Sequence, residues 1–338
     1  MKKICVVGAG RWGKNHIRTL DSLGCLGGIV ESNPEEQKAF QLSYPEMPVY
    51  SNIKDVFQDS FDGFTLATPA ETHLELGLTI MSEGYSVLIE KPLALNPADA
   101  KLLVEKADEM DVTLMVGHVL LFHPAIRKMK SLIDEGRIGD IQYIYSNRLN
   151  LGTVRKEENV FWSFAPHDIS IFQYFIESEP IKVSSNGAAF LQDNIYDTSL
   201  TSLTYANNIH GHIFVSWLHP FKEHRLVVSG SKGMIRFEDS AENKPLLFYE
   251  KDSNPDMELL SLKNKPSRKI EYEQSLPLTN ELKYFIDVVR GKQIDKATIE
   301  EGINVVKILE MATNSLSIPT NSKSPGSKLA RRNARRGR

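Results

Sequence analysis

The sequence predicts an N-terminal α/β domain with a doubly wound parallel sheet, followed by an α+β domain with a large, mostly antiparallel sheet. Over about the first 120 residues, short apolar runs alternate with helical stretches, which is typical of parallel strands joined by right-handed crossovers. From about Leu121 onward, strand-like runs follow one another with only turns between them, which indicates hairpins. A length of 338 residues allows about two domains with sizeable cores.

The first domain is predicted to span residues 1–120. Because each strand leads into a helix, the carboxyl ends of the strands meet at one edge of the sheet, where ligands of such folds bind. The predicted strands are 3–7, 26–31, 63–67, 86–90 and 113–116, and the predicted helices are 12–23, 34–42, 71–83 and 97–110.

The second domain is predicted to span residues 121–319, with helices on one face of its sheet. The other face is predicted to contact further copies of the chain, as a homodimer or homotetramer. The predicted helices are 124–135, 166–176, 279–290 and 299–314, and the predicted strands are 141–149, 199–205, 210–217, 224–229, 234–238 and 245–249, with a polar loop before the second helix.

The glycine motif Gly8-Ala9-Gly10-Arg11-Trp12-Gly13 directly follows the first predicted strand. Gly8 permits a tight turn, Gly10 lets the backbone approach a pyrophosphate, and Gly13 lets the following helix pack closely on the strand. The phosphates then bind the free N–H groups at the start of that helix. The motif therefore predicts a Rossmann dinucleotide site.

Glu31 ends the second predicted strand, eighteen positions after Gly13. A carboxylate at this place accepts the ribose hydroxyls of NAD and repels the 2′-phosphate of NADP, so NAD is the predicted cofactor. The alternative is a glycine-rich turn followed by a surface glutamate that binds nothing.

The tripeptide Glu90-Lys91-Pro92 lies at the end of another predicted strand. Gly8, Glu31, Thr68 and Lys91 all follow or end strands and are expected at the same sheet edge, so Lys91 should face the cofactor. Desolvation can lower the pKa of a lysine toward the working range, and a cis Pro92 would aim its side chain. The alternative is a strand-terminal lysine in solvent.

Together with residues 67–73 (ATPAETH), residues 90–95 (EKPLAL) and a later histidine, the glycine motif resembles the Gfo/Idh/MocA oxidoreductase family, over about residues 1–315. The resemblance implies an NAD-dependent sugar dehydrogenase in which Lys91 contacts the reacting hydroxyl and the nicotinamide, and Thr68 and Pro69 line the cofactor. The predicted cofactor-binding set is Gly8, Ala9, Gly10, Arg11, Trp12, Gly13, Glu31, Thr68, Pro69, His73, Glu90 and Lys91.

The later histidine is His167, and Lys91 and His167 are the predicted catalytic residues. A near-neutral imidazole can accept the hydroxyl proton as hydride leaves the same carbon. Pro166 suits a helix start, which would place His167 in a first turn where the helix dipole favours its neutral form. The family often has an Asp four residues earlier, where this chain has Ser163; Asp168 is the candidate replacement. The alternative is a structural histidine.

The segment 146–159 is polar and basic, and its cations are suited to gripping an anionic group. This stretch and residues 117–125 resemble family members that act on UDP-sugars, the 3-dehydrogenases of UDP-N-acetylglucosamine and its uronic acid. Open alternatives are a solvated loop, an inositol or simple-sugar dehydrogenase, and a non-catalytic NAD-binding sensor or regulator. The predicted substrate-binding set is Lys91, Arg148, Asn150, Arg155, Lys156, His167 and Asp168.

Composition argues against a membrane protein, a disulfide-rich protein, a metalloprotein and a nucleic-acid-binding protein. An apolar content of 41 % without a run of ~20 apolar residues predicts no membrane span, and two cysteines predict no disulfide framework, hence a cytoplasmic protein. His210, His212, His219 and His224 lack partners at metal-site spacing, so no metal is predicted. Residues 320–338 hold seven Lys or Arg and no acid. They are predicted to be a disordered tail rather than an arm for nucleic acid.

Overall fold

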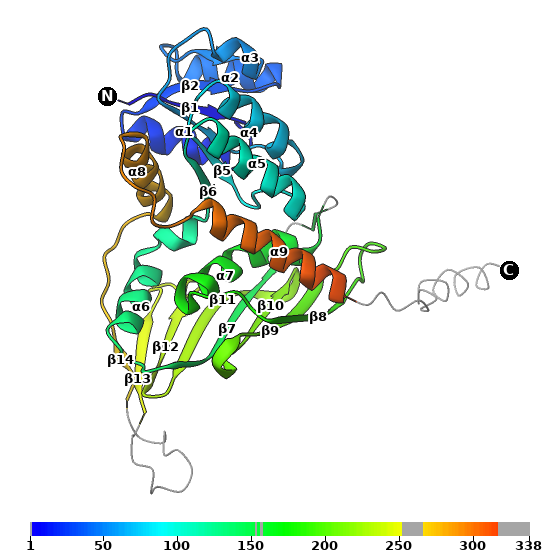
Figure 1. Cartoon of the computed structure of the whole chain (residues 1–338), viewed down its shortest axis with the longest axis vertical. Helices are drawn as coiled ribbons and strands as arrows, with labels where there is room; N and C mark the ends of the chain where they lie inside the picture. The colour runs from blue at the N-terminus through cyan, green and yellow to red at the C-terminus, as the bar shows by residue number, and fades with distance from the viewer. Residues whose placement is uncertain (1, 153, 156–157, 252–265, 317–338) are drawn as a thin grey trace, which may run out of the picture.

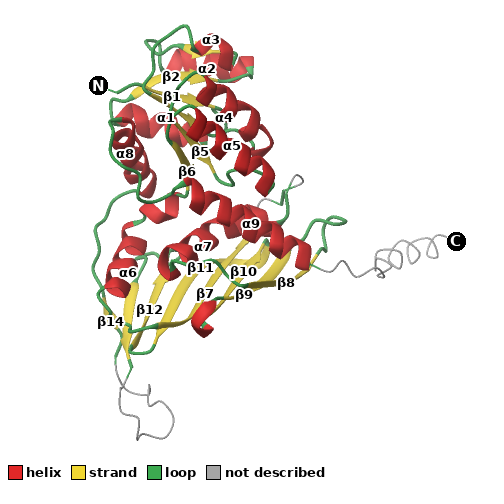
Figure 2. Cartoon of the chain, in the orientation of Figure 1, coloured by secondary structure: helices red, strands yellow, loops and turns green. Residues whose placement is uncertain are grey.

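Two sheets lie one above the other in the computed structural model (Figure 1). The structure describes residues 2–152, 154–155, 158–251 and 266–316. The predicted basic tail and Lys156 lie outside these described residues. Figure 2 shows the upper sheet between helices and the lower sheet with helices on its upper face. This arrangement confirms the predicted fold class.

The upper sheet has six described strands, all parallel, in the order β3-β2-β1-β4-β5-β6. Its order reverses direction between β1 and β4, as in a doubly wound sheet. The sequence analysis missed β3 and α3, which are too short to show a period. The strands are β1 (Ile4–Val7), β2 (Leu26–Val30), β3 (Val49–Tyr50), β4 (Gly63–Leu66), β5 (Val87–Glu90) and β6 (Leu114–Gly117), and the helices are α1 (Gly13–Ser22), α2 (Pro34–Ser43), α3 (Ile53–Val56), η1 (Ala70–Thr72), α4 (His73–Ser82) and α5 (Pro97–Glu109).

Side chains of this sheet alternate between two apolar cores, as the two-residue period of a strand requires. In β5, Leu88 belongs to the core on the α1 side, whereas Val87 and Ile89 belong to the core on the α4 and α5 side. Glu90 follows in the same alternation and therefore faces α1. A carboxylate is thus directed into the apolar side of the sheet.

The lower sheet has eight described strands in the order β14-β13-β12-β11-β7-β10-β9-β8, antiparallel except for β7 with β10. Helices α6, α7 and α9 cover its upper face (Figure 2). The elements are η2 (Val119–Phe122), α6 (Pro124–Asp134), β7 (Ile141–Leu151), α7 (Val160–Ile176), β8 (Lys182–Ala188), β9 (Thr198–Thr204), η3 (Ala206–Asn208), β10 (His210–Ser216), β11 (Leu218–Gly230), β12 (Gly233–Glu238), β13 (Leu246–Glu250), β14 (Arg268–Lys269), α8 (Pro277–Val289) and α9 (Ile299–Ser315).

Two sequence-based boundaries were wrong in this region. Strand β7 was predicted to end at Leu149 but continues to Leu151, which pairs with β11, so the polar segment that begins at residue 146 lies partly in the sheet. Helix α7 begins at Val160 rather than Pro166, because the Asn159 side chain accepts hydrogen bonds from the N–H groups of Phe161 and Trp162. Pro166 therefore lies inside the helix, where it removes one backbone hydrogen bond.

Helix α8 packs on the first domain although it follows the second domain in sequence. The predicted domain boundary at residue 120 assigns this helix to the second domain. Figure 1 shows α8 beside α1 at the upper sheet. A side chain built on Gly63 in β4 would come within 3.1 Å of Val289 and 3.4 Å of Phe285 in α8. Helix α9 then contacts both α5 and α7, so the C-terminal helices join the two domains.

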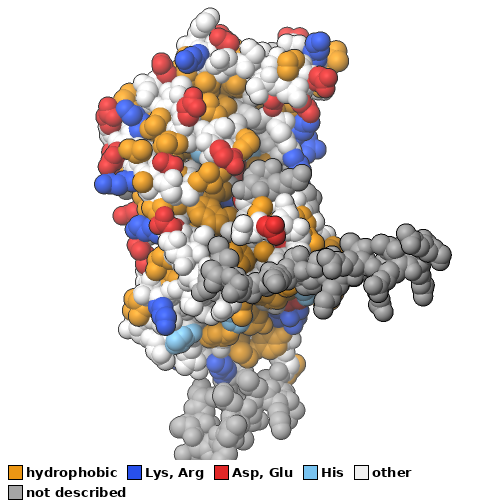
Figure 3. Space-filling view, turned by 90° about the vertical axis from the view of Figure 1, so that its right-hand side faces the viewer, with side chains coloured by type: hydrophobic (Ala, Val, Ile, Leu, Met, Phe, Trp, Pro, Cys, Tyr) orange, Lys and Arg blue, Asp and Glu red, His pale blue; other side chains and the backbone are white. Residues whose placement is uncertain are grey.

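On the face drawn in Figure 3, acidic and basic side chains of the described residues are interspersed among apolar ones, so neither sign of charge dominates this face. Among the helices that the structure describes, none is both long enough and apolar enough to cross a bilayer.

Candidate active site

The predicted cofactor residues gather at the carboxyl edge of the upper sheet. The Gly8 N–H donates to the Val30 carbonyl at 2.9 Å, and the Thr68 side chain lies directly beside Gly8. The first glycine turn, the end of β2 and the segment after β4 are therefore in contact, as the motif analysis expected. Pro69 follows Thr68 and precedes η1.

The glycine turn fits a dinucleotide. Gly8 has φ +87°, a backbone conformation that side chains rarely adopt, and a Cβ on Gly13 would lie 1.9 Å from the Gly8 carbonyl oxygen. A Cβ on Gly10 would meet no described atom within 4 Å, because it would point into open space beside the turn. This is the space that a pyrophosphate on the N-terminus of α1 would occupy, next to Ala9, Arg11 and Trp12.

The different surroundings of Gly13 and Gly10 predict different effects of an alanine substitution on stability. Gly13→Ala is expected to lower the free energy of unfolding by about 1–3 kcal/mol, because the new methyl group overlaps backbone. Gly10→Ala is the matched control, expected to change stability by less than about 0.5 kcal/mol but to weaken NAD binding. Thermal unfolding and NAD titration of both variants test this. Equal melting temperatures for the two would contradict the packing argument.

Glu31 is held at the end of β2 by two backbone donors. Its Oε2 accepts from the Ala9 N–H at 2.9 Å, and its Oε1 accepts from the Asn33 N–H at 2.9 Å. The carboxylate is therefore fixed beside the glycine turn, at the place where the ribose hydroxyls of NAD are expected.

Two residues predicted to contact the cofactor are buried instead. His73 is fully buried, with its ring nitrogens 2.9 Å from the Pro92 carbonyl oxygen and 3.1 Å from that of Thr68. Glu90 is 6 % exposed, and its Oε1 accepts from the Trp12 indole at 2.6 Å. Both side chains join segments that line the site, and their direct contact with the cofactor stays a prediction.

Lys91 lies between the two domains. The Lys91–Pro92 peptide bond is cis, and the Lys91 Nζ donates to the Ser163 carbonyl of α7 at 3.2 Å. Burial lowers the pKa of Lys91 below its ordinary value, while the carboxylates of Glu158 and Glu90 act in the opposite direction. Glu158 was not among the predicted site residues, because nothing in the sequence indicates which neighbour of Arg155 faces Lys91.

His167 lies one helical turn after Ser163, on the same face of α7. Its Nδ1 is buried and has no hydrogen-bond partner among the described residues. Burial, and then the positive charges of Lys91 and Arg148, hold the pKa of His167 well below its ordinary value. The imidazole is therefore neutral, as predicted, but the cause is burial and not the start of a helix.

Asp168 does not replace the missing orienting carboxylate of His167. Its two oxygens accept from Arg148 at 2.8 and 3.0 Å in a bidentate pair that is largely buried. Arg155 pairs with Glu158 at 3.1 Å. The positive charges of Arg148 and Arg155, which were predicted to bind an anion, are thus each already paired with a carboxylate. Asn150, another predicted substrate residue, lies in strand β7.

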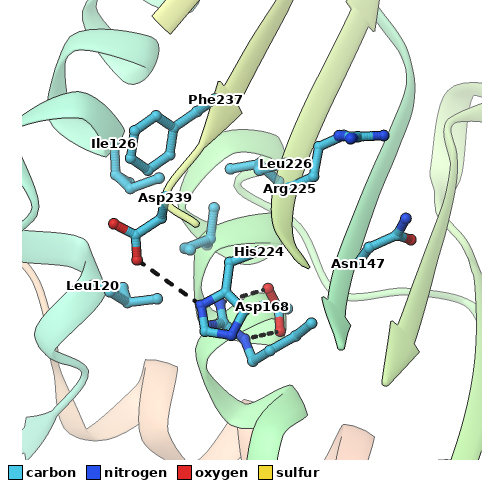
Figure 4. A pocket seen from close by; sticks show the side chains of 11 residues that line it. Leu120, Ile126, Asn147, Asp168, His224, Arg225, Leu226, Phe237 and Asp239 are labelled. Carbon is cyan, nitrogen blue, oxygen red and sulfur yellow. Dashed lines mark hydrogen bonds and ion pairs between the residues drawn. The ribbon is translucent and has the colours of Figure 1, made fainter. Parts of the chain in front are cut away.

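A small pocket adjoins this pair under α6 and α7. Figure 4 shows His224 beside Asp168, with Asp239 reaching His224 from the next strand; the Nδ1–Oδ2 distance is 4.0 Å. The sequence did not indicate that His224 and Asp239 lie close together, because only the pairing of β11 with β12 brings them near each other. The pocket lining comprises Leu120, Ile126, Asn147, Arg148, Asp168, Ile171, His224, Arg225, Leu226, Phe237 and Asp239. Within the part of the chain that the structure describes, no cluster of three or more metal-ligating side chains occurs.

Comparison with known proteins now identifies the family. Residues 2–118 match the model of the oxidoreductase family with an NAD-binding Rossmann fold, and residues 126–236 match the GFO/IDH/MocA C-terminal domain. The chain belongs to the Gfo/Idh/MocA oxidoreductase family. It is therefore an NAD-binding oxidoreductase, as the glycine motif and Glu31 predicted.

Several Gfo/Idh/MocA proteins are similar over almost the whole chain. Scyllo-inositol 2-dehydrogenase (NAD(+)) of Bacillus subtilis is 26 % identical, with 93 % of each chain covered. UDP-N-acetylglucosamine 3-dehydrogenase of Acidithiobacillus ferrooxidans superposes with a TM-score of 0.82 at 19 % identity, covering 93 % of this chain and 97 % of that one. The WlbA dehydrogenase of Bordetella pertussis, in complex with NADH and UDP-GlcNAcA, gives 0.76 at 22 % identity, covering 95 % and 99 %. All three of these relatives are named as dehydrogenases.

Proposed function

We propose that this protein oxidises a ring hydroxyl of a sugar, C3 of a UDP-N-acetylhexosamine or its uronate, with NAD as hydride acceptor. The observation that carries the proposal is the contact of the Lys91 Nζ with the Ser163 carbonyl, 3.2 Å apart. It places the lysine of β5, at the cofactor edge, one helical turn from the His167 imidazole on α7. A cation and a neutral base from two domains thus flank one site.

The two side chains have complementary roles in this proposal. Lys91 donates a hydrogen bond to the reacting hydroxyl and stabilises the negative charge that develops on its oxygen. His167 accepts the hydroxyl proton, which its depressed pKa allows because the imidazole is neutral at pH 7. Bound NAD supplies the hydride acceptor. Glu31, the glycine turn, Thr68 and Pro69 orient the cofactor toward the sugar.

The nucleotide part of the proposed substrate is supported by fold similarity to the two UDP-sugar dehydrogenases and by Arg155. The side chain of Arg155 is 41 % exposed despite its pairing with Glu158. Exchange of this exposed pairing for a diphosphate would cost little, since exposed ion pairs contribute about 0–1 kcal/mol.

A second candidate is an inositol or simple-sugar dehydrogenase. The two ion pairs Arg148–Asp168 and Arg155–Glu158 favour this candidate. Each pair offers hydrogen-bond donors and acceptors side by side without net charge, which suits the neutral hydroxyl groups of a polyol. The full-length similarity to scyllo-inositol 2-dehydrogenase agrees with this candidate.

A substrate panel separates the candidates. NADH formation is measured against UDP-sugars, free sugars and inositols, with NAD and NADP in parallel, for the native chain and for Arg155→Ala. Turnover of a UDP-sugar, with KM raised at least about tenfold by the substitution, supports the nucleotide-sugar proposal. Turnover of polyols alone, unaffected by the substitution, supports the second candidate. Clear NAD binding without turnover on any substrate would favour a sensor.

We also propose that copies of the chain associate through the lower face of the eight-stranded sheet. No described helix covers this face (Figure 1). Tyr143, Tyr145 and His212 form an aromatic group on it, with Tyr145 and His212 stacked at 5.1 Å between ring centroids. Leu200 lies nearby, 44 % exposed. Sedimentation analysis tests the proposal, and a monomer at micromolar concentration would contradict it.

A further inference from the structure

Glu90, the residue before Lys91, makes three polar contacts through its carboxylate. Its Oε1 accepts from the Trp12 Nε1 at 2.6 Å and lies 2.9 Å from the His16 Nε2. Its Oε2 accepts from the backbone N–H of Lys91 at 3.2 Å. The carboxylate thus links the glycine turn, helix α1 and the lysine that follows it.

The surroundings of Glu90 leave little freedom. A Cβ on Gly117 of the neighbouring strand β6 would lie 2.9 Å from the Glu90 Cδ, so only glycine fits there. His16 is fully buried, and Glu90 is 6 % exposed. A carboxylate in such a site is costly unless partners compensate it, and here an indole, an imidazole and a backbone amide do so.

The charged and titratable groups that face Glu90 come from five elements. His16 lies on α1, Lys91 follows β5, His73 begins α4, His118 follows β6, and Glu281 lies on α8. Burial acts to raise the pKa of Glu90, but the hydrogen bonds of His16 and Trp12 and the charges of His16 and Lys91 bring it below its ordinary value. Burial, and then the charge of Glu90, raise the pKa of Glu281 well above its ordinary value. The opposite directions of these two shifts favour Glu90 as the carboxylate of this group that carries the negative charge.

We propose that Glu90 is a positioning residue for Lys91: clamped by Trp12 and His16, it fixes the Lys91 backbone and places its carboxylate next to the lysine. The proposal rests on the assignment of Lys91 to the reacting hydroxyl. His73 supports the opposite side of the same peptide through the Pro92 carbonyl. Because Trp12 belongs to the glycine turn, its hydrogen bond to Glu90 also connects this turn to Lys91.

The sign of the charge effect can be measured without any substrate. Burial lowers the pKa of Lys91, and the negative charge of Glu90 raises it. In Glu90→Gln the carboxylate is lost at nearly constant shape, so the pKa of Lys91 should fall by about one unit. Competitive acetylation across a pH series, with the modified lysine quantified by mass spectrometry, gives this pKa. Glu90→Asp keeps the charge and should stay within about 0.3 units of the native value.

Glu83→Gln is the control, because this exposed residue ends α4 away from the site. An unchanged pKa of Lys91 in Glu90→Gln, or equal shifts in the Gln and Asp variants, would overturn the proposal. The measurement remains valid if no sugar is turned over, so it distinguishes failure of the clamp from failure of the proposed function. With an active substrate, the alkaline limb of kcat should move to lower pH by the same amount.

Trp12→Phe provides a second test that does not depend on folding of the Glu90 variants. Trp12 is 39 % exposed, and the substitution removes only the donor to Glu90. Loss of the hydrogen bond from Trp12 should loosen Lys91 and raise its acetylation rate in the absence of NAD severalfold. A native acetylation rate in this variant would refute the clamp even if Glu90→Gln fails to fold.

Discussion

Lys91→Ala is expected to lower kcat by about 10²–10⁴-fold while NAD still binds. The variant loses the only group that we assign to stabilising charge on the substrate oxygen, whereas the glycine turn and Glu31, which we propose to hold the cofactor, do not depend on it. Steady-state kinetics with the substrate identified by the panel, together with NAD titration, test this expectation.

Lys101→Ala is the matched control for Lys91. This lysine lies on the outer face of α5 with 74 % of its side chain exposed, so its loss should leave kcat unchanged. Because burial lowers the pKa of Lys91, the native enzyme should lose activity on the alkaline side at a pH below 10.5, the ordinary value for lysine. Near-native kcat in Lys91→Ala would remove the residue from the mechanism.

His167→Ala is expected to lower kcat by a similar factor of about 10²–10⁴, because the hydroxyl proton then has no positioned acceptor. In the native enzyme the pKa of His167 is depressed, so the imidazole stays neutral as the pH falls through 6.5. Activity should therefore persist through pH 6.5 and be lost only below the depressed pKa, which gives the pH profile of kcat/KM an acid limb. In the variant this acid limb of kcat/KM should disappear. pH–rate profiles of the two enzymes show the difference.

His210→Ala controls for loss of a histidine, since this side chain is exposed on β10, far along the chain from α7. It should retain native kinetics. An acid limb that survives unchanged in His167→Ala would assign it to another group. If kcat also stayed near native, His167 would have no part in proton transfer.

Local patterns in the sequence were enough for the parallel sheet and the cofactor edge. The turn at Gly8 requires a positive φ, and the contact of Gly13 with the Gly8 carbonyl leaves no room for a side chain. Such demands act within a few residues and therefore leave a readable motif. The position of Glu31 beside Ala9 depends on the pairing of β1 with β2, which the alternation of strands and helices predicted.

Pairings between distant segments could not be read from the sequence. The sequence predicted that the Arg148 side chain grips an anion, but α7 brings Asp168 to its guanidinium. Asn159 starts α7 six residues earlier than Pro166 suggested, which changes the environment of His167. Helix α8 likewise returns to the first domain although it follows the second in sequence.

The same distinction holds at Lys91. The sequence by itself determined that Lys91 ends a strand at the cofactor edge, because strand ends and glycine turns are set by neighbouring residues. Only the tertiary structure decided what surrounds it: Glu90 directed to Trp12 and His16, Glu158 facing it from the other domain, and α7 accepting its hydrogen bond. Burial and charge pairing depend on which distant segments pack together, and this determines whether a polar residue binds a ligand or another part of the chain.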